Sequence, residues 1–170
     1  MARTLLRYFA VLTLFLMYFI CEAYGQNIPN EKESLNGIKA LRVVIEDLKP
    51  DIEKDGLLKR SIQTDVELKL RLAGIKVIDN PNLKEGNSFL YINANILKSN
   101  NNTFYTYNIS VNIKQDVFLA RNNKLCYGAI TWSSGSIGII GKGDLPEIRQ
   151  DIKDHIDVFI NDYLEMNPKD

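Results

Sequence analysis

The clearest pattern in the chain is an alternation of apolar and polar residues from position 105 to position 119. Successive side chains of a β-strand point to opposite sides, so the two sets are expected on opposite faces of a sheet. Leu90 to Ile96 has the same period, and Leu125 to Ser133 follows as a third strand after a turn at 121–124. The pattern predicts an antiparallel meander with one face on the core and one in water. The apolar-side set is Tyr105, Tyr107, Ile109, Val111, Ile113, Gln115, Val117 and Leu119.

Apolar residues recur every three or four positions between Leu57 and Ala73, which predicts an amphipathic helix. Gly74 follows as a C-cap, because glycine tolerates the left-handed conformation that closes a helix. Strands are expected before the helix, within 38–47, and after it, within 75–78. Such a unit places its two strands parallel with a right-handed crossover. The expected buried stripe is Leu58, Ile62, Val66, Leu70 and Ala73.

A last helix is expected from Asp144, with Asp144 as N-cap, Pro146 in the first turn and Glu147 at the capping-box position. The glycine-rich stretch 135–143 before it is interpreted as a loop or a bulged strand end. The predicted fold class is α+β: a two-layer sandwich in which β-α-β precedes an antiparallel β-meander and a C-terminal helix, with both helices on one face of the sheet. The buried stripe of the last helix is Ile148, Ile152, Ile156, Phe159 and Tyr163.

The first 25 residues have the features of a secretory signal peptide: Arg3 and Arg7, an apolar run over 8–21, and small residues before a cut between Gly25 and Gln26. An uncleaved anchor is the rival interpretation, but the run falls short of the roughly 20 residues that span a bilayer. Lipidation at Cys21 is a second rival. Residues 26–37 are expected to be a flexible lead-in and 38–170 a single domain. The mature protein would be periplasmic or secreted, without stable membrane insertion.

The composition argues against two classes of protein, nucleic-acid binders and proteins with a structural zinc site. Lys and Arg number 21 against 21 Asp and Glu, with a pI near 6.6, which argues against a nucleic-acid binder. One His and two Cys are too few for an ordinary structural zinc site, which needs about four ligands. Cleavage would leave Cys126 alone, so no intramolecular disulfide can form.

Three groups of residues invite comparison with catalytic sites. Gly141-Lys142 lacks the spacing of a P-loop. Asp151 and His155 share a helix face at i and i+4, but the neighbouring charges indicate a solvated face. Ser133, Ser134 and Ser136 lack the elbow of a hydrolase nucleophile. No catalytic, cofactor-binding or metal-binding residue is assigned.

The polar side of the meander is the candidate partner surface, because short amide and hydroxyl side chains flanked by aromatic residues suit a protein or glycan. The exposed strand edges offer a second route, by addition of a partner's strand. Tyr91 and Trp132 are further candidates to flank the surface. The candidate surface comprises Asn93, Asn95, Thr106, Asn108, Ser110, Asn112, Phe104 and Phe118.

The order of elements resembles that of small bacterial envelope proteins, such as lipopolysaccharide-assembly lipoproteins and the N-terminal domain of a periplasmic transport protein. The run 70–77 and the alternation from Tyr105 to Leu119 carry this resemblance, at the level of topology. It implies an accessory role in a larger assembly.

The leading hypothesis is a non-catalytic exported protein that binds a larger periplasmic or envelope complex, as a small subunit or assembly factor. The alternative is a small-ligand or glycan carrier that uses the polar face or a pocket near Trp132. A hydrolase that uses His155 is a third hypothesis, and a homo-oligomer stays open.

Overall fold

The computed structural model describes residues 31–78 and 88–168. The expected signal peptide and its cleavage site lie outside the described residues. Within those ranges, no helix is both long and apolar enough to cross a membrane.

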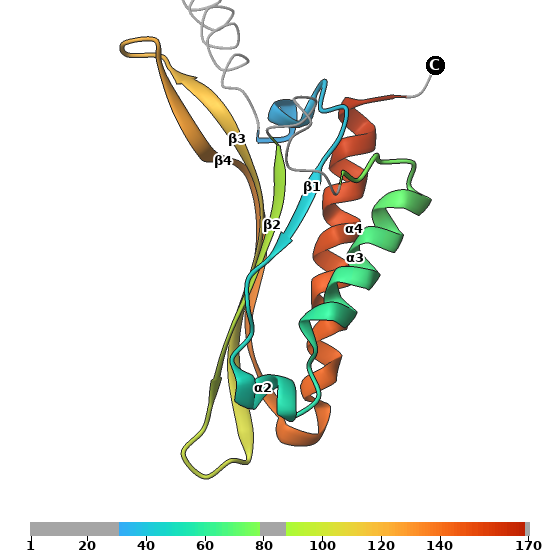
Figure 1. Cartoon of the computed structure of the whole chain (residues 1–170), viewed down its shortest axis with the longest axis vertical. Coiled ribbons are helices and arrows are strands. Elements are labelled where there is room, and N and C mark those ends of the chain that lie inside the picture. Colours follow the sequence, from blue (N-terminus) through green and yellow to red (C-terminus); the bar gives the residue numbers. More distant parts are fainter. Residues whose placement is uncertain (1–30, 79–87, 169–170) are drawn as a thin grey trace, which may run out of the picture. The chain divides into compact units, whose positions relative to one another are not determined.

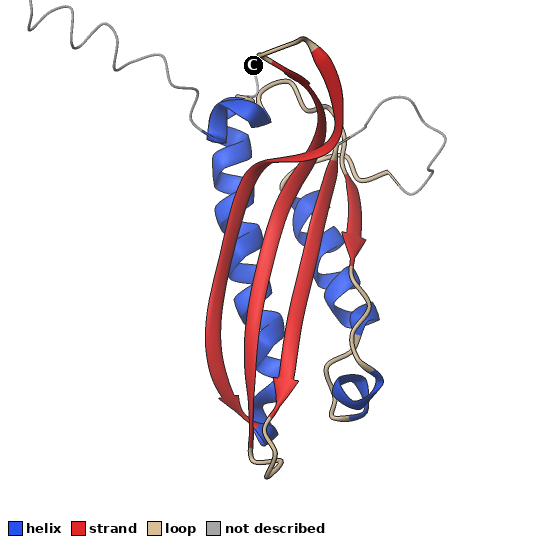
Figure 2. Ribbon diagram, turned by 90° about the vertical axis from the view of Figure 1, so that its left-hand side faces the viewer, coloured by secondary structure: helices blue, strands red, loops and turns tan. Residues whose placement is uncertain are grey.

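One sheet of four strands organises the described chain. It comprises β1 (Arg42–Ile45), β2 (Phe89–Lys98), β3 (Phe104–Leu119) and β4 (Lys124–Gly141), in the spatial order β1-β2-β3-β4. β1 pairs with β2 in parallel, and β2–β3 and β3–β4 are antiparallel. The predicted meander is therefore confirmed, and β4 forms one edge of the sheet (Figure 2).

Helices α3 (Lys59–Leu72) and α4 (Ile148–Met166) cover one face of this sheet (Figure 1). A short helix, α2 (Pro50–Lys54), lies between β1 and α3 in the chain. Figure 2 looks onto the opposite face, with the sheet in front of the helices. The fold is thus α+β with a C-terminal helix and both long helices on one side, as the sequence predicts.

The core lies between the helices and the sheet, and the two helical stripes supply much of it. Ile62, Val66 and Leu70 of α3 are buried, and Gly74 closes the helix with a positive φ of 79°. The predicted stripe is wrong at its start, because Leu58 is 47% exposed and Leu57 is buried instead. The buried residues of α4 are Ile148, Ile152, Ile156 and Phe159.

Three predicted elements differ from the structure. The expected strand at 75–78 contributes only a single parallel bridge, between Leu41 and Val77. The last helix begins at Ile148 rather than Asp144, because a 3-10 turn, η2 (Lys142–Glu147), precedes it and Asp144 makes no cap. Of the two interpretations of the glycine-rich stretch, the loop is wrong and the strand end is right, since β4 continues to Gly141; its bulges lie earlier in the strand.

The described part of the expected lead-in is also structured. Glu31–Leu35 form a 3-10 helix, η1, with Leu35 fully buried. Ser34 Oγ donates to the carbonyl of Thr131 on β4 at 3.0 Å. This segment therefore belongs to the folded body and covers part of the β4 edge.

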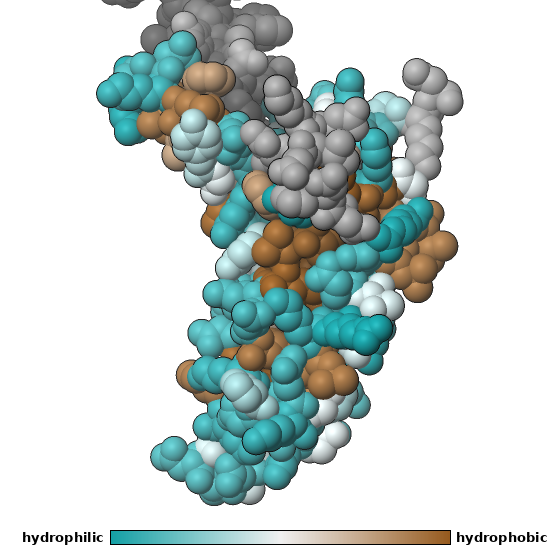
Figure 3. Space-filling model, in the orientation of Figure 1, coloured by the Kyte–Doolittle hydropathy of each residue, from teal (hydrophilic) through white to brown (hydrophobic). Residues whose placement is uncertain are grey.

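The β3–β4 hairpin projects beyond the helices as an arm (Figure 1). Register shifts at Ile113/Lys114 and at Gln115/Val117 mark where the arm leaves the sheet, as β-bulges do. The predicted core alternation consequently ends at Ile113, and Val117 and Leu119 are only half-buried. Figure 3 shows hydrophobic residues gathered on this arm, and Cys126 lies on it, half-buried.

Candidate functional site

The sheet surface turned away from α3 and α4, here called the open face, carries most of the predicted partner residues. Cross-strand register places Asn93 beside Ser110 and Asn95 beside Asn108. Register and strand alternation therefore place at least seven of the eight residues on one face: Asn93, Asn95, Phe104, Thr106, Asn108, Ser110 and Asn112.

Of the predicted flanking aromatic residues, Phe104 and Tyr91 lie on this face by strand alternation, and Trp132 does not. Phe104 and Phe118 lie at opposite ends of β3, and Phe118 is 67% exposed on the arm. Trp132 is buried in the core, with its ring edge against Phe159 and Nε1 donating to Asp162 at 3.0 Å. The suggestion that Trp132 flanks the polar face is thus wrong. Tyr91 does lie beside Asn112, with its hydroxyl bonded to Glu46 at 2.7 Å.

Sequence reasoning missed the apolar residues of the open face. Ile137 and Ile139 of β4 are 82% and 72% exposed, and Leu97 of β2 is 53% exposed. Register places Ile139, Thr106 and Leu97 in one row across the three strands. The alternation of Ile137, Gly138 and Ile139 indicates a strand with exposed isoleucines, but the interpretation of this stretch as a loop or bulged strand end did not use it.

The outer edge of β4 is the second feature of the site. In an antiparallel strand the N–H and C=O of one residue point to the same side, and alternate residues point to opposite sides. Ser133 N donates outward to Glu31, and the Thr131 carbonyl accepts from Ser34, so η1 covers the edge there. By the same alternation, the main-chain groups of Gly135, Ile137 and Ile139 also point outward. The described residues place no hydrogen-bond partner on these groups.

Polar side chains fix the inner side of the same strand to α4. His155 lies between two serines of β4: its Nδ1 is 2.8 Å from Ser134 Oγ and its Nε2 is 3.0 Å from Ser136 Oγ. One turn earlier, Asp151 accepts a hydrogen bond from the Tyr107 hydroxyl, which raises the pKa of Tyr107 to about 12. The prediction that Asp151 and His155 lie on a solvated face is therefore wrong, because both point toward the sheet.

This cluster holds the strand in place, and its geometry differs from that of a catalytic triad. A triad needs a carboxylate on one imidazole nitrogen and the nucleophile on the other. Here both nitrogens of His155 are bonded to serine hydroxyls, and Asp151 is bonded to Tyr107 instead. Among residues 31–78 and 88–168, no group of three or more His, Cys, Asp or Glu side chains is placed to hold a metal ion.

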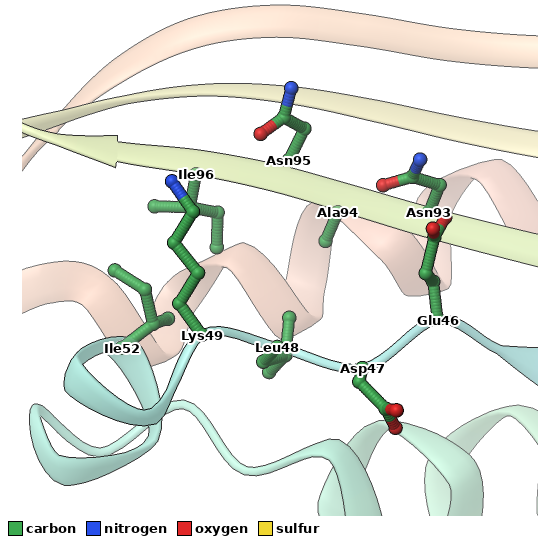
Figure 4. A pocket seen from close by; sticks show the side chains of 9 residues that line it. All are labelled: Glu46, Asp47, Leu48, Lys49, Ile52, Asn93, Ala94, Asn95 and Ile96. Carbon is green, nitrogen blue, oxygen red and sulfur yellow. The ribbon is translucent and has the colours of Figure 1, made fainter.

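A pocket of about 280 Å³ lies where β2 runs on beyond the end of β1 (Figure 4). Leu48, Ile52 and Ile96 give it an apolar part, while Glu46 points toward Asn93 and Asp47 turns away. A hydrogen bond from Lys59 lowers the pKa of Asp47 below its ordinary value. The pocket thus combines an apolar floor with a charged rim.

The chain matches no protein-family model and no curated protein sequence. It bears a weak structural resemblance to bacterial envelope proteins. The PelC dodecamer from Paraburkholderia phytofirmans is 12% identical with a TM-score of 0.41, over 69% of this chain and 85% of that chain. A minor lipoprotein from Acinetobacter baumannii is 11% identical with a TM-score of 0.32, over 73% and 91%. Both resemblances are weak, so the function must be argued from this chain's own residues.

Proposed function

We propose that this chain is a non-catalytic, exported accessory protein that binds a larger extracytoplasmic partner, and that the partner adds a β-strand to the outer edge of β4. The observation that carries the proposal is the edge from Gly135 to Gly141, which is uncharged and which no residue within 31–78 or 88–168 covers with a hydrogen bond.

Exposed strand edges usually carry protection, because unpaired N–H and C=O groups recruit other chains. Lysine, proline, inward charges or a covering loop are the common devices. None of the seven residues over 135–141 is charged or is proline. The covering segment η1 reaches only Thr131 and Ser133. An edge left in this state fits a partner that covers it in the assembled complex.

The side chains beside the edge suit a peptide strand. Strand addition takes its affinity from main-chain hydrogen bonds and its specificity from alternate side chains. Ile137 and Ile139 supply two exposed apolar side chains on the open face, next to the outward main-chain groups of the same residues.

The strand is also held in its binding shape before a partner arrives. Ser134 and Ser136 are tied to His155 from the helix side, and their neighbours in sequence provide the outward main-chain groups. A rigid edge loses little conformational entropy on binding, which favours affinity.

The test uses mild cross-linking of the mature protein in its native envelope fraction, followed by pulldown and size-exclusion mass. Ile137→Pro is the sharpest variant, since the lost N–H points away from β3 and the internal ladder stays intact. We expect stoichiometric co-elution with one larger complex, and at least a tenfold loss of capture in Ile137→Pro. Leu68→Lys is the control, because Leu68 is 54% exposed on α3, which packs against β1 and α4.

Hydrogen exchange on the purified complex separates strand addition from other contacts. The amides of Gly135, Ile137 and Ile139 should become protected together, while the arm amides stay unchanged. Elution of the mature protein as a solitary species, or undiminished capture by Ile137→Pro, would overturn the proposal.

A further inference from the structure

A shallow polar hollow of about 520 Å³ lies on the open face above Gly135. Its walls come from two neighbouring strands: Asn108, Ser110 and Asn112 of β3, and Ser133 and Ile137 of β4. No residue that lines it is charged. It is separate from the pocket beside β1 in Figure 4, which the Asn93–Ile96 segment of β2 lines.

Gly135 creates the hollow. A Cβ at this position would lie 2.5 Å from the carbonyl oxygen of Ile109, so no side chain fits and β4 runs tightly against β3. The face is therefore bare at the β4 end of the row that Asn93, Ser110 and Gly135 form.

Asn112 is the observation that points to a ligand. Its side chain lines the hollow and is only 9% exposed. Within the described part of the chain, no hydrogen bond reaches its amide, which offers two donors and an acceptor. The amide nitrogen and oxygen stay accessible from the hollow, so their hydrogen-bonding capacity is available to a ligand there.

We propose that the hollow binds a neutral saccharide. Amide and hydroxyl side chains each donate and accept, which matches vicinal sugar hydroxyls without any charge on either side. Ile137, 82% exposed at the wall, offers an apolar surface to the C–H face of a sugar ring. A peptide is less well matched, because the main-chain groups it pairs with lie at the β4 edge rather than in the hollow. The inference goes beyond strand addition and does not depend on it.

The test is an amide-resolved NMR titration of the isotope-labelled mature protein. The probes are neutral oligosaccharides of glucose and of N-acetylglucosamine, an oligogalacturonate as the charged comparison, and an uncharged Gly-Ser-Asn peptide. We expect saturable shifts within 108–112 and 133–137 for at least one neutral oligosaccharide, and weaker binding of the oligogalacturonate and the peptide.

Asn112→Leu should weaken that binding at least about fivefold, since it removes the amide at nearly constant volume. The substitution leaves no new buried polar group, so the variant is expected to fold. Asn95→Ala is the matched control, because this exposed amide lies on the same face outside the hollow; its affinity should stay within about twofold. Absence of saturable shifts with every neutral oligosaccharide, equal binding of the peptide, or unchanged affinity in Asn112→Leu would overturn the proposal. None of these outcomes alters the capture experiment at the β4 edge.

Discussion

Removing the Tyr107 hydroxyl should show how strongly α4 is fastened beneath β3 and β4. In Tyr107→Phe the hydrogen bond to Asp151 is lost while the ring remains over Gly138. The carboxylate is then left half-buried without its donor. We therefore expect a measurable loss of stability with little change in apolar packing.

The magnitude follows from the pKa of Tyr107, which the hydrogen bond to Asp151 and the burial of the phenol together raise from 10.0 to about 12. Two pKa units correspond to about 2.7 kcal/mol between the two protonation states, at about 1.36 kcal/mol per unit. Part of this is screened because the pair is only half-buried, so about 1–2 kcal/mol is expected near neutral pH. The pKa of Tyr107 is raised on folding, so this contribution is fully present below pH 10 and is lost as the pH rises toward about 12.

Urea unfolding of the wild type, Tyr107→Phe, Asp151→Asn and the double variant gives the coupling free energy of the pair. The ultraviolet difference titration between wild type and Tyr107→Phe isolates the Tyr107 phenol. It should titrate well above the ordinary tyrosine pKa, and closer to that pKa in Asp151→Asn. A phenol that titrates near 10 in the wild type, together with a coupling below about 0.5 kcal/mol, would refute the reasoning.

Two further predictions concern the same fold. Gly135→Ala should destabilise the protein by about 1–3 kcal/mol in urea unfolding, because the new Cβ meets a main-chain oxygen that cannot move aside. Gly143→Ala, whose Cβ would meet nothing within 4 Å, should stay within about 0.5 kcal/mol; equal effects would show that the close approach at Gly135 does not matter. Hydrogen bonds from Lys98 and Tyr105 lower the pKa of Asp55, so its contribution to stability is present above pH 3.8 and is lost as the pH falls through the lowered pKa. The melting temperatures of wild type and Asp55→Asn should thus converge in acid, and a constant gap at all pH values would contradict this.

The sequence predicted the fold well where side-chain period alone decides. The alternation of β3 and the stripe of α4 name their buried residues almost without error up to Ile113 and Phe159. The β-bulges beyond Ile113 could not be foreseen, because they shift the register of β4 without a change in the pattern of β3. The sequence therefore placed Val117 and Leu119 on the core face, whereas both are only half-buried.

The second half of β4 was not recognised as a regular strand, because glycine disfavours strands and this stretch carries three glycines, at 135, 138 and 141. In the folded chain the Tyr107 ring fills the space left by Gly138, so a partner far away in sequence compensates for the missing side chain. Without a regular strand at 134–136, the sequence also did not indicate that Ser134 and Ser136 would face His155. The polar residues of β2 and β3 could be predicted from their alternation with apolar residues. The outer edge, the exposed Ile137 and Ile139, and the hollow above Gly135 could not, because they all depend on the course of β4.

The position of η1 has a consequence for the order in which the chain folds. β2, β3 and β4 are joined by short turns, so their pairing needs only local loop closure, which is fast. Ser34 and Thr131 are 97 residues apart, so closing η1 over β4 requires a much longer loop. During folding, the outer edge of β4 at Thr131 and Ser133 is thus expected to stay open to other chains until η1 docks. A newly exported molecule would then be most prone to aggregation in the interval between meander formation and the docking of η1.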